Sequence, residues 1–157
     1  ASDRRPKGVA FRPLAAAGLA PVGVDLAQLA IDRAESYPKA GDESFEVGDF
    51  LDPGWREGKS FSAIWEHTCY CAIDPSRRPD YALACADLIA PGGCLVGVFF
   101  LTPHDPGEES DGPPFNSTIP EIDARFEPWF VREHGWIPEN AHPGREGKEW
   151  VAVFRRK

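Results

Sequence analysis

The sequence predicts an α/β protein built on a doubly wound, mostly parallel sheet that ends in an antiparallel hairpin. Strand-like and helix-like segments alternate along the 157 residues, which favours parallel strands joined by helices. The run Cys94–Leu101 is almost wholly apolar, as in a central strand covered on both faces. Near the end, Phe130–Ile137 and Glu149–Arg156 flank a turn-rich loop, so they predict the closing hairpin.

Three further strands are expected where short apolar runs end in acidic or turn residues. Pro21–Asp25 ends in an acid, and Ser44–Val47 is closed by the turn that begins at Gly48. Phe61–Glu66 is the third of these runs. Residues 51–60 and 102–116 are polar or rich in proline and glycine, and we expect loops there.

Four segments carry helix signals. Pro13–Gly18 has proline in its first turn and glycine at its C-terminal cap. Ala27–Tyr37 and Arg78–Ala90 have apolar residues at helical spacing. Thr118–Glu121 has the form of a capping box, so a helix should begin there.

Composition bounds the class of protein. With 42% hydrophobic residues, the chain can build the core of one domain. Its net charge of −8 argues against binding to nucleic acid, and no apolar run approaches the length of a membrane span. The spacing of the four cysteines fits no zinc pattern, so we expect reduced thiols in a cytoplasmic protein.

Candidate ligand-binding residues follow the predicted strands, because open α/β sheets bind ligands at the carboxyl ends of parallel strands. Asp25 could accept hydrogen bonds from ribose hydroxyls, or be an exposed acid at a strand end. Asp49 could accept from an adenine amino group with Phe50 packed on the base, or both could belong to a turn. Glu66 could face an ammonium group with His67 lining the pocket, or both could be solvated.

Five motifs occur in an order and at a spacing that together are specific. They are Val22-Gly23-Val24-Asp25-Leu26, Gly48-Asp49-Phe50, Tyr70-Cys71-Ala72-Ile73-Asp74-Pro75 with Arg78-Pro79, Leu88-Ile89-Ala90-Pro91-Gly92-Gly93, and Gly112-Pro113-Pro114-Phe115. From residue 14 to about residue 157 the chain resembles the thiopurine S-methyltransferase family of S-adenosylmethionine-dependent methyltransferases. The resemblance is greatest to the halide and thiol methyltransferase branch of that family.

The resemblance implies a Rossmann-like class I methyltransferase fold and S-adenosyl-L-methionine as cofactor. It assigns six residues to cofactor binding: Asp25, Leu26, Asp49, Phe50, Glu66 and His67. Asp25 would bind the ribose, Asp49 and Phe50 the adenine, and Glu66 and His67 would lie beside the methionine moiety. Four residues would wall the acceptor pocket: Tyr70, Phe100, Pro114 and Phe115, although Phe100 could equally belong to the core. No residue is assigned to acid–base catalysis or to a metal.

The implied reaction is direct displacement of the sulfonium methyl group by a small soft nucleophile: a thiol, a halide or a thiopurine. Rate would come from proximity and from removal of water from the anion. The alternative is a catalytically impaired methyltransferase-like domain that serves in binding or interaction. A nicotinamide-dependent oxidoreductase is favoured less, since no Gly-x-Gly-x-x-Gly occurs. The expected partner is a small-molecule methyl acceptor, without nucleic acid or membrane, and the oligomeric state stays open.

The chain departs from the family pattern at its start. We expect a single domain over 1–157 that lacks the family's N-terminal cover and its first strand with the glycine-rich loop. Before Leu14 only Gly8 is present, with no Gly-x-Gly. Our hypothesis is that residues are missing around Gly8 and Val9.

Two expectations concern the acceptor side. In the loop 102–116 we expect mobility over 105–111 and order over 113–115, packed against Tyr70 or Phe100, with Phe115 as a lid. Arg78 has two interpretations: a charge near an anionic acceptor, or a solvated residue at a helix start. The second is favoured.

Overall fold

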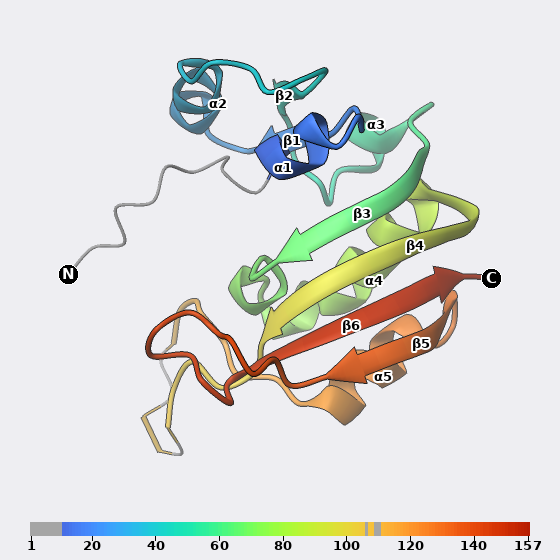
Figure 1. Ribbon diagram of the computed structural model, residues 1–157. Coiled ribbons are helices and arrows are strands. Elements are labelled where there is room, and N and C mark those ends of the chain that lie inside the picture. Colours follow the sequence, from blue (N-terminus) through green and yellow to red (C-terminus); the bar gives the residue numbers. More distant parts are fainter. Residues whose placement is uncertain (1–10, 106, 109–110) are drawn as a thin grey trace. The chain divides into compact units, whose positions relative to one another are not determined.

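The structure is a computed structural model, and it describes residues 11–105, 107–108 and 111–157 (Figure 1). The chain forms two compact units, Ala1–Trp55 and Arg56–Lys157. The region around Gly8 and Val9, where residues are expected to be missing, lies outside the described residues. Within the described part of the chain, no helix is both long enough and apolar enough to cross a membrane.

The first unit contains a parallel pair of strands. β1 (Val22–Asp25) pairs with β2 (Ser44–Val47), with Val22 opposite Ser44 and Asp25 opposite Val47. The strands are linked by α2 (Gln28–Glu35) and preceded by α1 (Phe11–Ala16). Because the strands run in the same direction, both carboxyl ends lie at one edge of this sheet.

Close packing in this unit explains one of its glycines. The Phe11 and Phe45 rings meet edge to face, with their centroids 5.9 Å apart. A Cβ at Gly23 would lie 2.6 Å from the Phe45 ring, so the β1 backbone can approach that ring only without a side chain.

The second unit contains a four-stranded sheet in the order β3-β4-β6-β5. β3 (Phe61–His67) runs parallel to β4 (Ile89–Phe100). β6 (Glu149–Arg156) is antiparallel to β4 and to β5 (Phe130–Trp136). The α/β class and the C-terminal hairpin are thus confirmed. The sheet of this unit is mixed, because β6 lies between β4 and β5 and runs against both.

The helices of this unit and the apolar side of its sheet enclose an aromatic core. α4 (Arg78–Leu88) and α5 (Ile119–Phe126) contact each other and lie behind the sheet in Figure 1. Six rings, each at most 2% exposed, pack together there: Tyr70, Phe99, Phe126, Phe130, Trp150 and Phe154. They are in edge-to-face or tilted contact, as aromatic pairs prefer.

Some element boundaries differ from the sequence-based expectations. β4 begins at Ile89, because Ile89 pairs with Phe61 before the chain turns at the Pro-Gly-Gly segment. A Cβ at Gly93 would lie 2.6 Å from the Ser62 carbonyl oxygen, so this turn needs glycine against β3. The expected loop 51–60 contains a short helix, α3 (Pro53–Arg56). Two 3-10 turns, η1 (Tyr70–Ala72) and η2 (Pro75–Arg77), connect β3 to α4.

Candidate functional site

Asp25 ends β1 as an exposed carboxylate that is already oriented. Its Oδ1 accepts a hydrogen bond from the Ala27 backbone N–H at 2.9 Å. Its Oδ2 has no partner among the described residues. Leu26 follows with 72% of its surface exposed. The arrangement is compatible with both interpretations of Asp25, since the turn uses one oxygen and the other is available to a ligand.

Asp49 repeats this arrangement after β2. Its Oδ1 accepts from the Leu51 backbone N–H at 2.8 Å. The Gly48 N–H donates to the Asp25 carbonyl at 3.0 Å and so ties the two strand ends together. Phe50 is half-buried, and its ring centroid lies 6.3 Å from that of Trp55.

Glu66, near the end of β3, is buried rather than solvated. Its side chain is 2% exposed, and Oε1 accepts from the backbone N–H groups of Cys69 at 2.6 Å and Tyr70 at 2.8 Å. Oε2 is buried without a hydrogen-bond partner in the described structure. Burial raises the pKa of Glu66 to about 7, although the two backbone hydrogen bonds act in the opposite direction. The solvated interpretation of Glu66 is therefore wrong, because its carboxyl group closes the turn that leads into η1.

The neighbouring residues reveal a strained turn that the sequence did not predict. His67 is exposed, with its ring centroid 6.4 Å from that of Trp65. Thr68 has a φ of 59°, in the left-handed region that β-branched residues rarely adopt. Its N–H still pairs with the Val98 carbonyl at 3.0 Å. Strain of this kind collects at functional sites, and here it lies at the carboxyl end of β3.

Tyr70 lies in the aromatic core of the second unit. It is 1% exposed and contacts the rings of Tyr81, Phe99 and Phe126. Burial raises its pKa above the usual value for a phenol. A part in the acceptor wall stays a prediction for this residue.

Phe100, at the end of β4, is half-buried beneath a cation. The Arg145 guanidinium carbon lies 4.5 Å from the Phe100 ring centroid. Arg145 Nη1 also pairs with Glu149 Oε1 at 3.1 Å. No sequence pattern points to Arg145, because it is a lone cation in a turn-rich loop.

The residues 113–117, which we call the strap, are anchored by their backbone. The Phe115 N–H donates to the Cys71 carbonyl at 2.7 Å, and the Ser117 N–H to the Leu101 carbonyl at 2.8 Å. His104 Nε2 lies 2.8 Å from the Pro114 carbonyl oxygen, which accepts from it. Phe115 and Pro114 are half-buried. The strap thus lies against η1, the turn that contains Tyr70, while residues 106, 109 and 110 of the same loop lie outside the described residues.

Arg78 is buried, so its favoured interpretation as a solvated residue is wrong. Arg78 is 1% exposed and pairs with Glu121 at 2.8 Å. The guanidinium also lies 4.7 Å from the Tyr70 ring centroid. The charge is buried because a carboxylate, backbone carbonyls and an aromatic face surround it.

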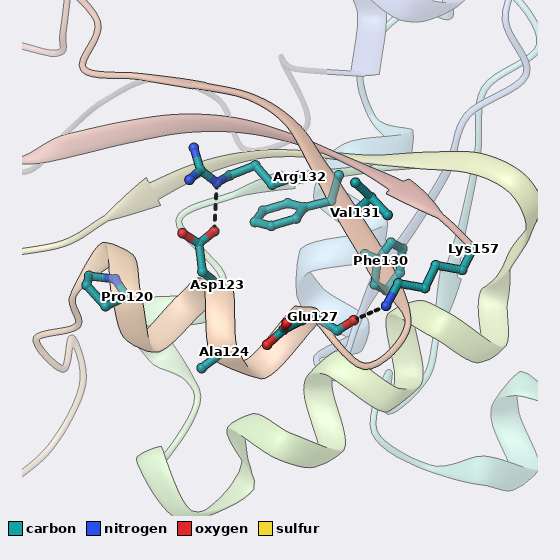
Figure 2. A pocket seen from close by; sticks show the side chains of 9 residues that line it. Pro120, Asp123, Ala124, Glu127, Phe130, Val131, Arg132 and Lys157 are labelled. Atoms are coloured by element: carbon teal, nitrogen blue, oxygen red, sulfur yellow. Dashed lines mark hydrogen bonds and ion pairs between the residues drawn. The ribbon is translucent and has the colours of Figure 1, made fainter.

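A surface groove of about 630 Å³ lies between α5 and β5 (Figure 2), and no predicted site residue lines it. Two contacts cross it: Arg132 Nε to Asp123 Oδ1 at 2.9 Å, and Lys157 Nζ to the Glu127 carbonyl at 2.6 Å.

In the part of the chain that is described, no group of three or more side chains could hold a metal ion. The four cysteines are free thiols.

Comparison with solved structures defines the class of protein. The fold matches a SAM-dependent methyltransferase from Methanosarcina mazei with a TM-score of 0.74, at 17% identity over 92% of this chain and 85% of that one. It also matches the N-methyltransferase NodS from Bradyrhizobium japonicum, solved with S-adenosyl-L-homocysteine, with a TM-score of 0.68. That match has 15% identity and covers 95% of this chain and 72% of the other. The fold is that of S-adenosylmethionine-dependent methyltransferases.

Sequence comparison then gives the family. The profile described as Thiopurine S-methyltransferase (TPMT) matches residues 7–134, so the chain belongs to the thiopurine S-methyltransferase family. It is 33% identical over 142 residues to thiocyanate methyltransferase 1 of Brassica oleracea, covering 86% of this chain and 59% of that protein. It is 33% identical over 106 residues to a probable thiol methyltransferase 2 of Arabidopsis thaliana, covering 65% and 44%. The chain thus spans less than two thirds of the length of these relatives.

Proposed function

We propose that this protein transfers a methyl group from S-adenosyl-L-methionine to a small soft nucleophile by direct displacement. The candidate acceptors are a thiol, a halide and a thiopurine. The observation that carries the proposal is the carboxyl end of β4, where the half-buried Phe100 ring lies under the Arg145 guanidinium. An aromatic surface beside a cation suits a weakly hydrated anion. Relatives named thiocyanate and thiol methyltransferases support the same acceptor class.

The residues of the first unit fit the nucleoside part of the cofactor. Asp25 and Asp49 each hold one oxygen in a backbone hydrogen bond and leave the other free. Free carboxylate oxygens suit the ribose hydroxyls and the adenine amino group, respectively. Leu26 and Phe50 would supply apolar contact beside them.

Glu66 and His67 are proposed to lie beside the methionine moiety. The unpartnered Oε2 of Glu66 is the atom that would accept a hydrogen bond from the ammonium group. A charged donor there would also favour the ionised carboxylate. When bound, the cofactor supplies an electrophilic methyl group on a sulfonium centre.

The acceptor wall is proposed to consist of Tyr70, Phe100, Pro114 and Phe115. A thiolate or halide needs no base to remove a proton, so the wall has only to hold the nucleophile in line and exclude water. This agrees with the absence of a general base from the predicted acceptor residues. Arg145, which also pairs with Glu149 at 3.1 Å, would place a cation beside the bound anion.

The direct test is a methyl-transfer assay of the full chain with radiolabelled S-adenosyl-L-methionine and a panel of iodide, thiocyanate, hydrogen sulfide, a small thiol and a thiopurine. Labelled product with at least one acceptor is expected. Cofactor binding without transfer to any of them would overturn the proposal and favour the alternative, a binding domain without activity.

We further propose that the protein acts in the cytoplasm, on a small-molecule acceptor and without a nucleic-acid or membrane partner. The support is its four free thiols and its net charge of −8.

A further inference from the structure

Arg78 is a buried cation that connects four segments of the second unit. It lies in the first turn of α4, and its side chain is 1% exposed. Its guanidinium reaches the first turn of α5 through Glu121, two carbonyl groups of the strap, and the ring of Tyr70 in η1. Burying a charge is expensive, so an arginine in this position needs all of these contacts.

The contact with α5 neutralises the charge. Arg78 Nη1 donates to Glu121 Oε1 at 2.8 Å, and the Glu121 carboxylate is 29% exposed. Glu121 is fixed by the cap of its own helix, because its N–H donates to Thr118 Oγ1 at 3.3 Å. The ion pair therefore joins the amino ends of α4 and α5.

The contacts with the strap use both terminal nitrogens of the guanidinium, whereas Nε is buried without a hydrogen-bond partner in the described structure. Nη1 donates to the Asn116 carbonyl at 3.2 Å, and Nη2 to the Phe115 carbonyl at 3.4 Å. The face of the same group lies 4.7 Å from the Tyr70 ring centroid. A lysine is a point charge on a flexible stem and cannot make these planar contacts at once.

We propose that Arg78 is a positioning residue, which holds the strap and its Phe115 in a fixed place against η1. The ordering of the strap follows from the contacts above, whereas its effect on acceptor binding rests on the proposed function. Phe115 then serves as a fixed wall of the acceptor site, and Arg78 governs acceptor binding without touching the acceptor.

The structural test is hydrogen exchange of the full chain carrying Arg78→Lys. The matched control is Arg77→Lys, since Arg77 is 52% exposed and pairs with Asp80 at 3.7 Å at the surface. The exchange rates of two strap amides, those of Phe115 and Ser117, measure how firmly the strap is held. The amides of Cys69 and Tyr70 donate to Glu66, and their exchange rates measure whether the turn after β3 is also loosened.

Arg78→Lys should speed exchange of the strap amides by about tenfold and leave the other two within about twofold. Arg77→Lys should change neither pair. Unchanged strap amides, or equal acceleration of all four, would overturn the proposal, because a general structural role would loosen every amide alike. Should Arg78→Lys fail to fold, Glu121→Gln decides by the same criterion, since it keeps an oxygen for Arg78 but removes its counter-charge.

The functional arm uses any acceptor that the chain methylates. Arg78→Lys should raise the acceptor KM by about tenfold, with kcat and the cofactor Kd changed by less than about twofold. An unchanged KM alongside faster strap exchange would overturn the link to the acceptor. A wild-type chain that methylates nothing refutes the proposed function instead, and hydrogen exchange alone then decides the role of Arg78.

Discussion

At the scale of single residues, three carboxyl groups near strand ends differ in environment. Asp25 and Asp49 each have one oxygen in a turn and one free, and Asp25 is exposed. Glu66 is 2% exposed and has its pKa raised to about 7. Asp25 is therefore open to a ligand from solvent, whereas the carboxyl group of Glu66 is enclosed by the chain.

Asp25→Asn should weaken S-adenosyl-L-methionine binding by at least about tenfold, because a hydrogen bond to a charged acceptor contributes roughly 1.5–3 kcal/mol. The measurement is the Kd from calorimetric titration. Asp32→Asn is the control: Asp32 is also an acid of the first unit, but it lies in α2 and accepts from Gln28 at 2.7 Å. Equal Kd values for the two variants would remove Asp25 from the cofactor site.

Glu66 should make the wild-type protein less stable as the pH rises from about 4.5 to about 7. Its pKa is raised in the folded state, so the folded protein binds the proton more tightly than the unfolded chain does. This stabilisation is full below the unfolded pKa and is lost as the pH passes the folded pKa. The loss amounts to about 3 kcal/mol at most.

The measurement is the free energy of unfolding by urea at pH 5 and pH 8 for the wild type and Glu66→Gln. The variant lacks the titrating group, so its stability should change less between the two pH values. Glu57→Gln is the control, since Glu57 is exposed. Identical pH profiles for wild type and Glu66→Gln would contradict the assignment.

At the scale of elements, the proposed site residues are positioned by the connections between helices and strands. The turn after β3 is fixed by Glu66 and passes through the left-handed Thr68. The strap is bonded to that turn through Cys71 and to the end of β4 through Leu101. Loops held in this way can present a side chain at a constant position, as binding sites require.

Phe115→Ala should lower the rate of methyl transfer and leave the cofactor Kd nearly unchanged, because its ring is proposed to touch only the acceptor. Steady-state kinetics and calorimetric titration of the same sample provide the two values. Trp136→Ala, which removes an aromatic ring that is 50% exposed, is the control and should change neither. A normal kcat/KM for the acceptor in Phe115→Ala would show that the ring is not part of the acceptor wall.

At the scale of the whole molecule, the stability of the second unit rests on its aromatic core. Phe126 is fully buried and contacts Tyr70, Phe99, Phe130 and Phe154. Phe126→Ala should therefore lower the free energy of unfolding by about 3–5 kcal/mol. Val131→Ala is the control, because Val131 is 54% exposed and should cost well under 1 kcal/mol. Urea unfolding measures both, and similar losses would contradict this account of the core.

The class of fold could be read from the sequence because it depends on local patterns. Apolar runs and helical spacing follow from burial on one or both faces, and capping residues such as Thr118 mark helix starts. The ordered motifs likewise identified the family, which the profile match over residues 7–134 confirms. The cofactor and acceptor residues stay predictions.

What the sequence determined by itself was therefore the order of the elements, the family and the residues at the strand ends. Only the tertiary structure decided where the charges of Arg78 and Glu66 lie. Both residue types are usually exposed, so no local pattern predicts their burial. Arg78 is buried because Glu121, 43 residues further along the chain, supplies the counter-charge. Glu66 is buried because the chain turns back over it after β3 and donates two backbone N–H groups. Such compensation forms only when distant segments pack together.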